Sequence, residues 1–441
     1  METIRKTVEG YRNLILEAER YIWKNPETGF KEFKTSQYLA EKFRELGYDI
    51  TLAEDIPGFF TVVDTFRPGP EILVLAELDS IICRTHPEAD KETGAVHSCG
   101  HNAQCAALLG IAAALKNEKI IEKLSGRIRL CATPAEELIE IEYRTELKKQ
   151  GKIKYFVGKS EFLSRGYFDG VDMAFMVHTA YNFATISGAI GSITKTAIYK
   201  GKATHASGSP WLGKNALYAA ICGLNAVNAL RETFKESDLI KVHPIITDGG
   251  SMVNAIPEEA KLESYVKGKT NKAINEANEK VNQALIGAAY SLGTNIEIID
   301  APGYFPLVNE ANLLSLAKEA FELALPEEEI EQINEFTTGS TDMGDLSSIM
   351  PVIHPYAGGA YGTGHGKDYE IRDPERACIK SAIWQLTIIK LLLEKGAERA
   401  NKIIKNFVPE FKSKEEFLAY QDSKNTSGER IIYHDNGAEI I

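Results

Sequence analysis

The segment His97-Ser98-Cys99-Gly100-His101 places a thiol and an imidazole two residues apart, a spacing at which both can bind one transition-metal ion. Gly100 lets the backbone turn the two side chains to the same side. A buried thiol beside a surface histidine explains an isolated pair of this kind equally well. The motif therefore makes the chain a candidate metalloenzyme.

Two adjacent carboxylates, Glu136 and Glu137, follow the apolar run 128–132. One carboxylate can hold a metal ion while its neighbour takes a proton from water. The alternative is an acidic pair that complements the start of a helix. His178 similarly follows the apolar run 173–177, although a single histidine is more often structural than a ligand.

Three apolar runs (72–76, 128–132 and 173–177) alternate with helical patterns, which predicts an α/β domain with a mostly parallel sheet. Ligands bind at the carboxyl ends of strands in such sheets. A helix predicted over 102–115 places Cys99 and His101 at its N-terminal end, where free N–H groups favour a thiolate.

From residue 193 the pattern changes to a βαββαβ order, which predicts an inserted ferredoxin-like domain. The expected division is a catalytic domain of residues 1–191 and 304–400, an insert of residues 192–303, and a charged C-terminal tail of residues 401–441 without strong periodicity. His205 lies on the insert, and His365 lies in a glycine-rich loop that alone indicates only a flexible surface segment.

Composition excludes several classes of protein. The 441 residues carry a net charge of −12, which opposes binding to nucleic acid. The N-terminal residues 1–23 predict an amphipathic helix rather than a signal peptide, and no apolar run reaches the ~18 residues of a membrane span. The six cysteines lack the spacing of a disulfide framework, so we expect free thiols and a cytoplasmic location.

A series of short motifs follows in order along the chain: Asn25-Pro26-Glu27-Thr28-Gly29-Phe30, Glu77-Leu78-Asp79, His97 to Asn102, Pro134 to Glu137, Gly201 to His205, Asn254 to Pro257, Gly339 to Asp345, and Gly364-His365. This set resembles the M20 metallopeptidases, specifically the amidohydrolase branch of aminoacylases, auxin-conjugate hydrolases and p-aminobenzoyl-glutamate hydrolases. The resemblance extends from about residue 10 to 395.

The resemblance implies two divalent transition-metal ions, zinc or manganese, and five ligands: Cys99, His101, Glu137, His178 and His365. It also implies Glu136 as the general acid/base and a metal-bound water as the nucleophile. The insert would serve as lid and homodimer surface. The resemblance assigns His205 to oxyanion stabilisation and assigns Asn254, Lys267, Gly339 and Ser340 to substrate binding.

The sequence departs from the common pattern of the family in three places. Glu77 and Asp79 replace a His-x-Asp motif, so Glu77 is not expected to be a ligand and Asp79 is expected to orient one. Asn102 replaces the Asp of much of the branch, although Asn is typical of the p-aminobenzoyl-glutamate type. Lys267 replaces an Arg, and lysine cannot form the two parallel hydrogen bonds by which arginine binds a carboxylate.

The sequence thus predicts a metal-dependent amidohydrolase that cleaves an N-acyl or aminoacyl amino acid, a small-molecule substrate. A dipeptidase of the same fold is one alternative. A binding protein that kept the fold without turnover is another, although the intact Glu136 argues against it.

Overall fold

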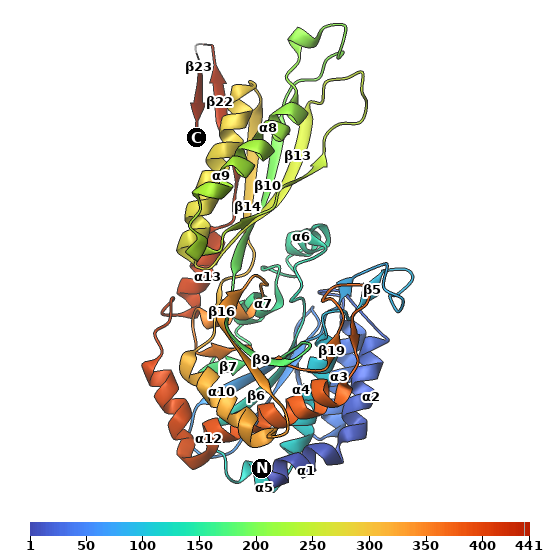
Figure 1. The fold of residues 1–441 in the computed structure, drawn as a ribbon, viewed down its shortest axis with the longest axis vertical. Coiled ribbons are helices and arrows are strands. Elements are labelled where there is room, and N and C mark those ends of the chain that lie inside the picture. The colour runs from blue at the N-terminus through green and yellow to red at the C-terminus, as the bar shows by residue number, and fades with distance from the viewer. Residues whose placement is uncertain (436) are drawn as a thin grey trace. The chain divides into compact units, whose positions relative to one another are not determined.

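The computed structural model describes residues 1–435 and 437–441, which form two compact units (Figure 1). The first unit comprises Met1–Gly188, Leu307–Phe336 and Thr341–Lys414, and the second comprises Ala189–Pro306, Thr337–Ser340 and Glu415–Ile441. An α/β unit interrupted by a second unit is the architecture that the sequence predicts. Among the described residues, no helix combines the length and apolar character that a membrane span needs.

The main sheet of the first unit contains, in spatial order, β1 (Thr51–Leu52), β2 (Phe59–Asp64), β6 (Arg127–Thr133), β3 (Glu71–Glu77), β7 (Met173–Phe175) and β17 (Val352–Ile353). The pairs β3–β6, β3–β7 and β7–β17 are parallel, whereas β2 pairs antiparallel with β1 and β6. Every residue of β3 is buried, which explains its continuous apolar run.

Helix α4 (His101–Ala114) is buried along its whole length. It contacts β3, α2 (Arg12–Trp23) and α12 (Ser381–Asn406), and a helix covered on all sides is apolar all round. The N-terminal segment was predicted as one helix but forms two, α1 (Glu2–Gly10) and α2. They separate at Gly10 and Tyr11, where a glycine disfavours helix continuation.

The remaining elements of the first unit are short or lie outside the main sheet. They are α3 (Phe33–Glu45), β4 (Ile81–Ile82), β5 (Ala95–Val96), α5 (Glu118–Ile121), α6 (Ile141–Lys149), α7 (Gly158–Ser164), β8 (His178–Thr179), β9 (Phe183–Ala189), β15 (Leu307–Val308), α10 (Ala311–Ala324), β16 (Ile330–Thr337), α11 (Met343–Ser347), β18 (Tyr356–Ala357), β19 (Ala360–Tyr361), β20 (Glu370–Ile371) and the π-helix η4 (Glu375–Lys380).

The second unit has the predicted βαββαβ order: β10 (Gly191–Lys200), α8 (Ala216–Ala229), β11 (Lys241–Val242) with β12 (Ile245–Asp248), β13 (Glu259–Gly268), α9 (Asn271–Ser291) and β14 (Asn295–Pro302). Its sheet is antiparallel, and α8 and α9 lie side by side on it (Figure 1). Three short 3-10 helices lie in its loops: η1 (Pro210–Leu212), η2 (Arg231–Thr233) and η3 (Glu236–Asp238).

The C-terminal segment differs from the featureless tail that the sequence indicates. It forms α13 (Lys414–Ser423), β21 (Thr426–Glu429), β22 (Ile431–His434) and β23 (Gly437–Ile440). Strand β21 pairs antiparallel with β14 and extends the sheet of the second unit, and Ile431 enters the core of that unit. The polar sequence of β21 has no apolar alternation that would indicate a strand, and its ladder to β14 is made by backbone groups, which every residue carries.

Candidate metal centre

The turn before α4 presents Cys99 and His101 from the start of the helix. Gly100 between them has a φ of 87°, a left-handed conformation. A Cβ atom at this position would lie 2.4 Å from Tyr369 Oη and 2.8 Å from Thr179 Cβ. Both the backbone conformation and the close neighbours therefore require glycine here, in agreement with the role that the sequence predicts for it.

A first cluster contains Cys99, His101 and His178, whose ligand atoms lie within 4.8 Å of one another. Cys99 Sγ is 3.4 Å from His178 Nε2, and His178 Nδ1 is 2.8 Å from the carbonyl oxygen of Thr179. Because a carbonyl only accepts, the ring proton of His178 lies on Nδ1 and the lone pair of Nε2 faces the thiol.

His101 is oriented in the same manner from the end of β3. Its Nδ1 lies 2.9 Å from the carbonyl oxygen of Asp79 and 3.2 Å from Asp79 Oδ1. Asp79 Oδ2 also accepts a 2.9 Å hydrogen bond from the backbone N–H of Glu137. Asp79 thus contacts both a ring and a backbone segment of the cluster, the geometry of the orienting role that the sequence assigns to it.

A second cluster contains Cys99 again, with Glu137 and His365. His365 Nε2 lies 2.9 Å from Glu137 Oε1, and the backbone N–H of His365 donates to the carbonyl oxygen of Ser98 over 2.8 Å. This backbone hydrogen bond fastens the glycine-rich loop to the His97–His101 turn. Arg144, which is buried, donates to the carbonyl oxygen of Glu137 and so holds the backbone that carries the Glu137 carboxylate.

The donor chemistry of both clusters suits divalent transition metals. Burial lowers the pKa of His178 to about 4, so its ring is neutral and able to ligate at physiological pH. Burial raises the pKa of the Cys99 thiol well above its usual range, with the neighbouring Glu137 carboxylate adding to the shift. Burial thus opposes the thiolate that the helix terminus favours, and a bound cation would stabilise the ionised form.

Glu136 lies beside these clusters, and its carboxylate shares a 4.8 Å neighbourhood with His101 and Glu137. Burial raises the pKa of Glu136 well above its usual range, and the carboxylates of Glu77, Glu137 and Asp342 raise it further. A carboxylate with a raised pKa accepts a proton readily near neutral pH, as a general base must.

Sequence reasoning missed a buried ionic network behind this centre. Lys159 Nζ lies 2.6 Å from Glu77 Oε1 and also contacts Asp342 Oδ1, and all three side chains are fully buried. Glu77 Oε2 lies 3.2 Å from His101 Nε2. Asp342 belongs to a motif visible in the sequence, but no signal separates Lys159 from surface lysines.

The remaining predicted site residues lie in the second unit. His205 forms a bridge with Ala255, and the backbone N–H of Ala206 donates to the carbonyl oxygen of Asn254 over 2.9 Å. His205 Nδ1 accepts from the backbone N–H of Gly208 at 2.9 Å, so the ring proton lies on Nε2 and can be donated. His205 and Asn254 are thus brought together by the backbone.

Lys267 and Ser340, predicted for substrate binding, also meet within the second unit. Lys267 Nζ donates to Ser340 Oγ over 3.1 Å, and Gly339 precedes Ser340 directly. An ammonium group beside a hydroxyl and a glycine is an arrangement that can bind a carboxylate.

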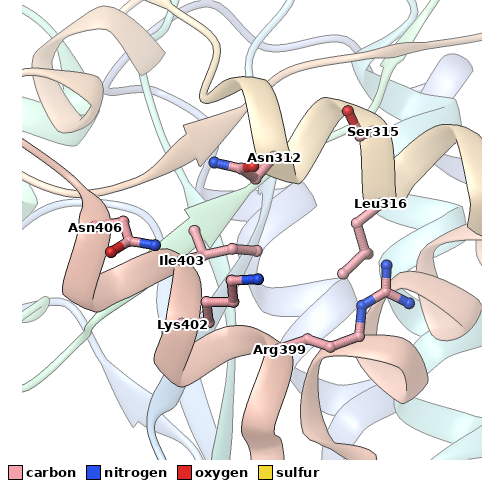
Figure 2. Close-up of a pocket in the computed structure, with 7 residues that line it drawn as sticks. All are labelled: Asn312, Ser315, Leu316, Arg399, Lys402, Ile403 and Asn406. Carbon is pink, nitrogen blue, oxygen red and sulfur yellow. The ribbon is translucent and has the colours of Figure 1, made fainter.

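A cavity of about 250 Å³ opens between α10 and the last turns of α12 in the first unit (Figure 2). It is lined by Asn312, Ser315, Leu316, Arg399, Lys402, Ile403 and Asn406. Arg399 Nη1 and Nη2 donate to the two carboxylate oxygens of Glu319 over 2.9 and 2.6 Å. No predicted site residue lines this cavity.

Residues 77–388 match the sequence model of peptidase family M20/M25/M40. The human Xaa-Arg dipeptidase is 30% identical over 361 residues, which cover 76% of this chain and 74% of the relative. The N-acetyl-L-cysteine deacetylase of Bacillus subtilis (strain 168) is 26% identical, covering 73% of each chain. A solved structure from Bacillus subtilis, described as a dinuclear metal binding peptidase of the M20 family, superposes with a TM-score of 0.66 at 19% identity, covering 87% of this chain and 99% of its own.

Fold and site together define a metal-dependent hydrolase of amide bonds. The chain belongs to peptidase family M20/M25/M40.

Proposed function

We propose that the two clusters would hold two divalent ions, zinc or manganese, with Cys99 belonging to both ligand sets. His101 and His178 complete one ligand set, and Glu137 and His365 complete the other. The observation that carries this proposal is that both triads contain the same sulfur atom. Ions bound there supply Lewis-acid polarisation of the scissile carbonyl and lower the pKa of a water molecule.

The side chains around the centre then supply proton transfer, ligand orientation and oxyanion stabilisation. Glu136 accepts a proton from the attacking water and returns it to the departing amine nitrogen, for which its raised pKa is suited. Asp79 holds the ring of His101 in its orientation. His205 donates from Nε2 to the oxyanion that develops on the carbonyl.

The substrate class that we propose is an N-acyl or aminoacyl amino acid. Lys267 and Ser340 bind its carboxylate, with Gly339 adjoining Ser340, and Asn254 supports the substrate from the segment that carries His205. Lysine acts as a point charge and orients a carboxylate less strictly than arginine does, so several amino acids are accommodated.

Hydrolysis by the purified protein of a panel containing N-acetyl amino acids, p-aminobenzoyl-glutamate and unblocked dipeptides tests this proposal. We expect chelation to abolish turnover and added Zn²⁺ or Mn²⁺ to restore it. Cys99→Ala should lower the metal content measured by elemental analysis, because thiolate ligation contributes directly to ion affinity. Cys105→Ala is the matched control, since Cys105 is a buried cysteine of α4 outside both clusters.

A dipeptidase activity is the second candidate, and the match to the human Xaa-Arg dipeptidase favours it. Faster cleavage of dipeptides with a C-terminal arginine than of any N-acyl amino acid would support this alternative. Bound metal without turnover of the whole panel would instead support a binding protein.

We also infer a cytoplasmic homodimer that associates through the second unit. Its six cysteines are free, as the reducing cytoplasm requires. Large apolar side chains are exposed on α8 and its neighbouring loops, including Trp211, Tyr218 and Val253, which are 76%, 62% and 100% exposed. A second copy of the chain would cover them, which sedimentation of the purified protein tests.

A further inference from the structure

A third group of ligand atoms lies behind the proposed centre and supplies no ligand to either of its two ions. The carboxylates of Glu77, Glu136 and Asp342 offer oxygen atoms within 4.8 Å of one another, and all three residues are buried. Three carboxylates gathered away from water repel one another unless a cation lies among them or a proton is bound by one of them.

The cation present is the side chain of Lys159. Its ammonium lies 2.6 Å from Glu77 Oε1 and contacts Asp342 Oδ1, and the side chain has no exposed surface. The backbone N–H of Lys159 donates to the second oxygen of Asp342 over 2.9 Å. Asp342 therefore binds the lysine at both its backbone and its ammonium group.

The backbone at the start of α7 holds this lysine in place. Gly158 packs so closely on the turn after β6 that a Cβ atom there would lie 1.7 Å from the carbonyl oxygen of Pro134. This contact anchors Lys159 beside the segment that carries Glu136. Its ammonium cannot withdraw to solvent, because the side chain is buried along its whole length.

We propose that Lys159 is a built-in cation that fills the cluster of Glu77, Glu136 and Asp342 and keeps a further metal ion out of it. The inference rests on the proposed two-metal centre, whose ion number it limits. An ammonium group and a divalent ion compete for the same carboxylate oxygens, and the tethered ammonium is always present at its site. The ammonium thereby offsets part of the negative charge of the cluster without another metal.

The test compares the number of Mn²⁺ ions bound per chain in the wild type and in Lys159→Met, by equilibrium dialysis and elemental analysis. We expect Lys159→Met to bind one more ion than the wild type. Lys159→Met/Asp342→Asn should lose that additional ion. Lys195→Met is the matched control, since Lys195 is also buried and paired with a carboxylate, that of Asp300, but lies at no three-carboxylate cluster of the described residues.

Lys159→Gln keeps hydrogen-bond donors and provides a second variant if the methionine variant does not fold. Mn²⁺ should also raise the unfolding temperature of either variant more than that of the wild type. Equal ion numbers in the wild type and in a folded Lys159 variant would overturn the inference. A wild type that binds neither Mn²⁺ nor Zn²⁺ would instead overturn the proposed centre, so the two failures are distinguishable.

Discussion

Asn102 donates its side-chain amide to Glu19 Oε1 over 2.7 Å, and both side chains are buried. The contact joins α2 to the first turn of α4, one residue after the candidate ligand His101. It also accounts for an asparagine where much of the amidohydrolase branch has aspartate, because an aspartate would place a second carboxylate against Glu19.

Asn102→Asp should therefore lower the free energy of unfolding at pH 8 by about 1–3 kcal/mol, because a buried hydrogen bond becomes a repulsive contact. Urea denaturation measures the loss. Glu19→Gln in the same chain restores an amide–carboxylate pair and should recover part of the stability. Equal stability of Asn102→Asp and the wild type would contradict this account of the position.

Glu19 should also make the stability of the first unit depend on pH. Burial raises its pKa from 4.5 to about 7, and the neighbouring Arg20 only partly opposes the shift. A carboxyl group with a pKa raised by folding stabilises the protein below its unfolded pKa, and this contribution is lost as pH rises through the folded pKa.

Glu19→Gln should thus be more stable than the wild type at pH 8 by on the order of 3 kcal/mol, and the difference should vanish near pH 4. Urea denaturation from pH 4 to 8 measures both curves. Glu17→Gln, on the exposed side of α2, serves as the control. Parallel curves for Glu19→Gln and the wild type would show that Glu19 carries no such shift.

Several parts of the fold can be predicted from the sequence because their apolar residues follow a simple pattern. The apolar runs of β3, β6 and β7 identify buried strands, and the parallel arrangement gathers their carboxyl ends. Asp79, Glu137 and His178 are brought together in this way, as expected from the position of each after its strand.

Other parts depend on contacts that no local pattern encodes. His365 reaches the centre through a backbone hydrogen bond to Ser98, and the glycine-rich sequence of its loop does not reveal that contact. Lys159 becomes distinctive only once Glu77 and Asp342 surround it. The raised pKa of Cys99 is likewise a result of burial, which the helix position alone does not report.

Glu136→Gln should retain the wild-type metal content yet lose turnover by about 10²- to 10⁴-fold, because an amide cannot accept the proton that a general base must take. Single-substrate kinetics with elemental analysis of the same preparation measure both quantities. Near-normal turnover at full metal content would remove Glu136 from the proposed role.

Mixed dimers test whether His205 of one subunit completes the site of the other. Glu136→Gln and His205→Ala homodimers should each be nearly inactive. A mixed dimer has one site with both residues intact, and random mixing makes about half of the dimers mixed, so about a quarter of full activity should return.

Subunit exchange must be verified with differently tagged chains before activity is compared. Verified exchange without recovered activity would mean that His205 acts within its own subunit or has no role in turnover.

Strand β21 pairs with β14 although the whole passage Leu307–Lys414 separates them in the chain. Protein synthesis adds ~5–20 residues per second, so β14 is made on the order of 10 s before β21. Its edge stays unpaired during that time. Unpaired edges invite pairing with other nascent chains, and charged side chains discourage it. Glu297 on β14, whose side chain is partly exposed, is a charged residue of the kind that discourages such pairing on a half-built sheet.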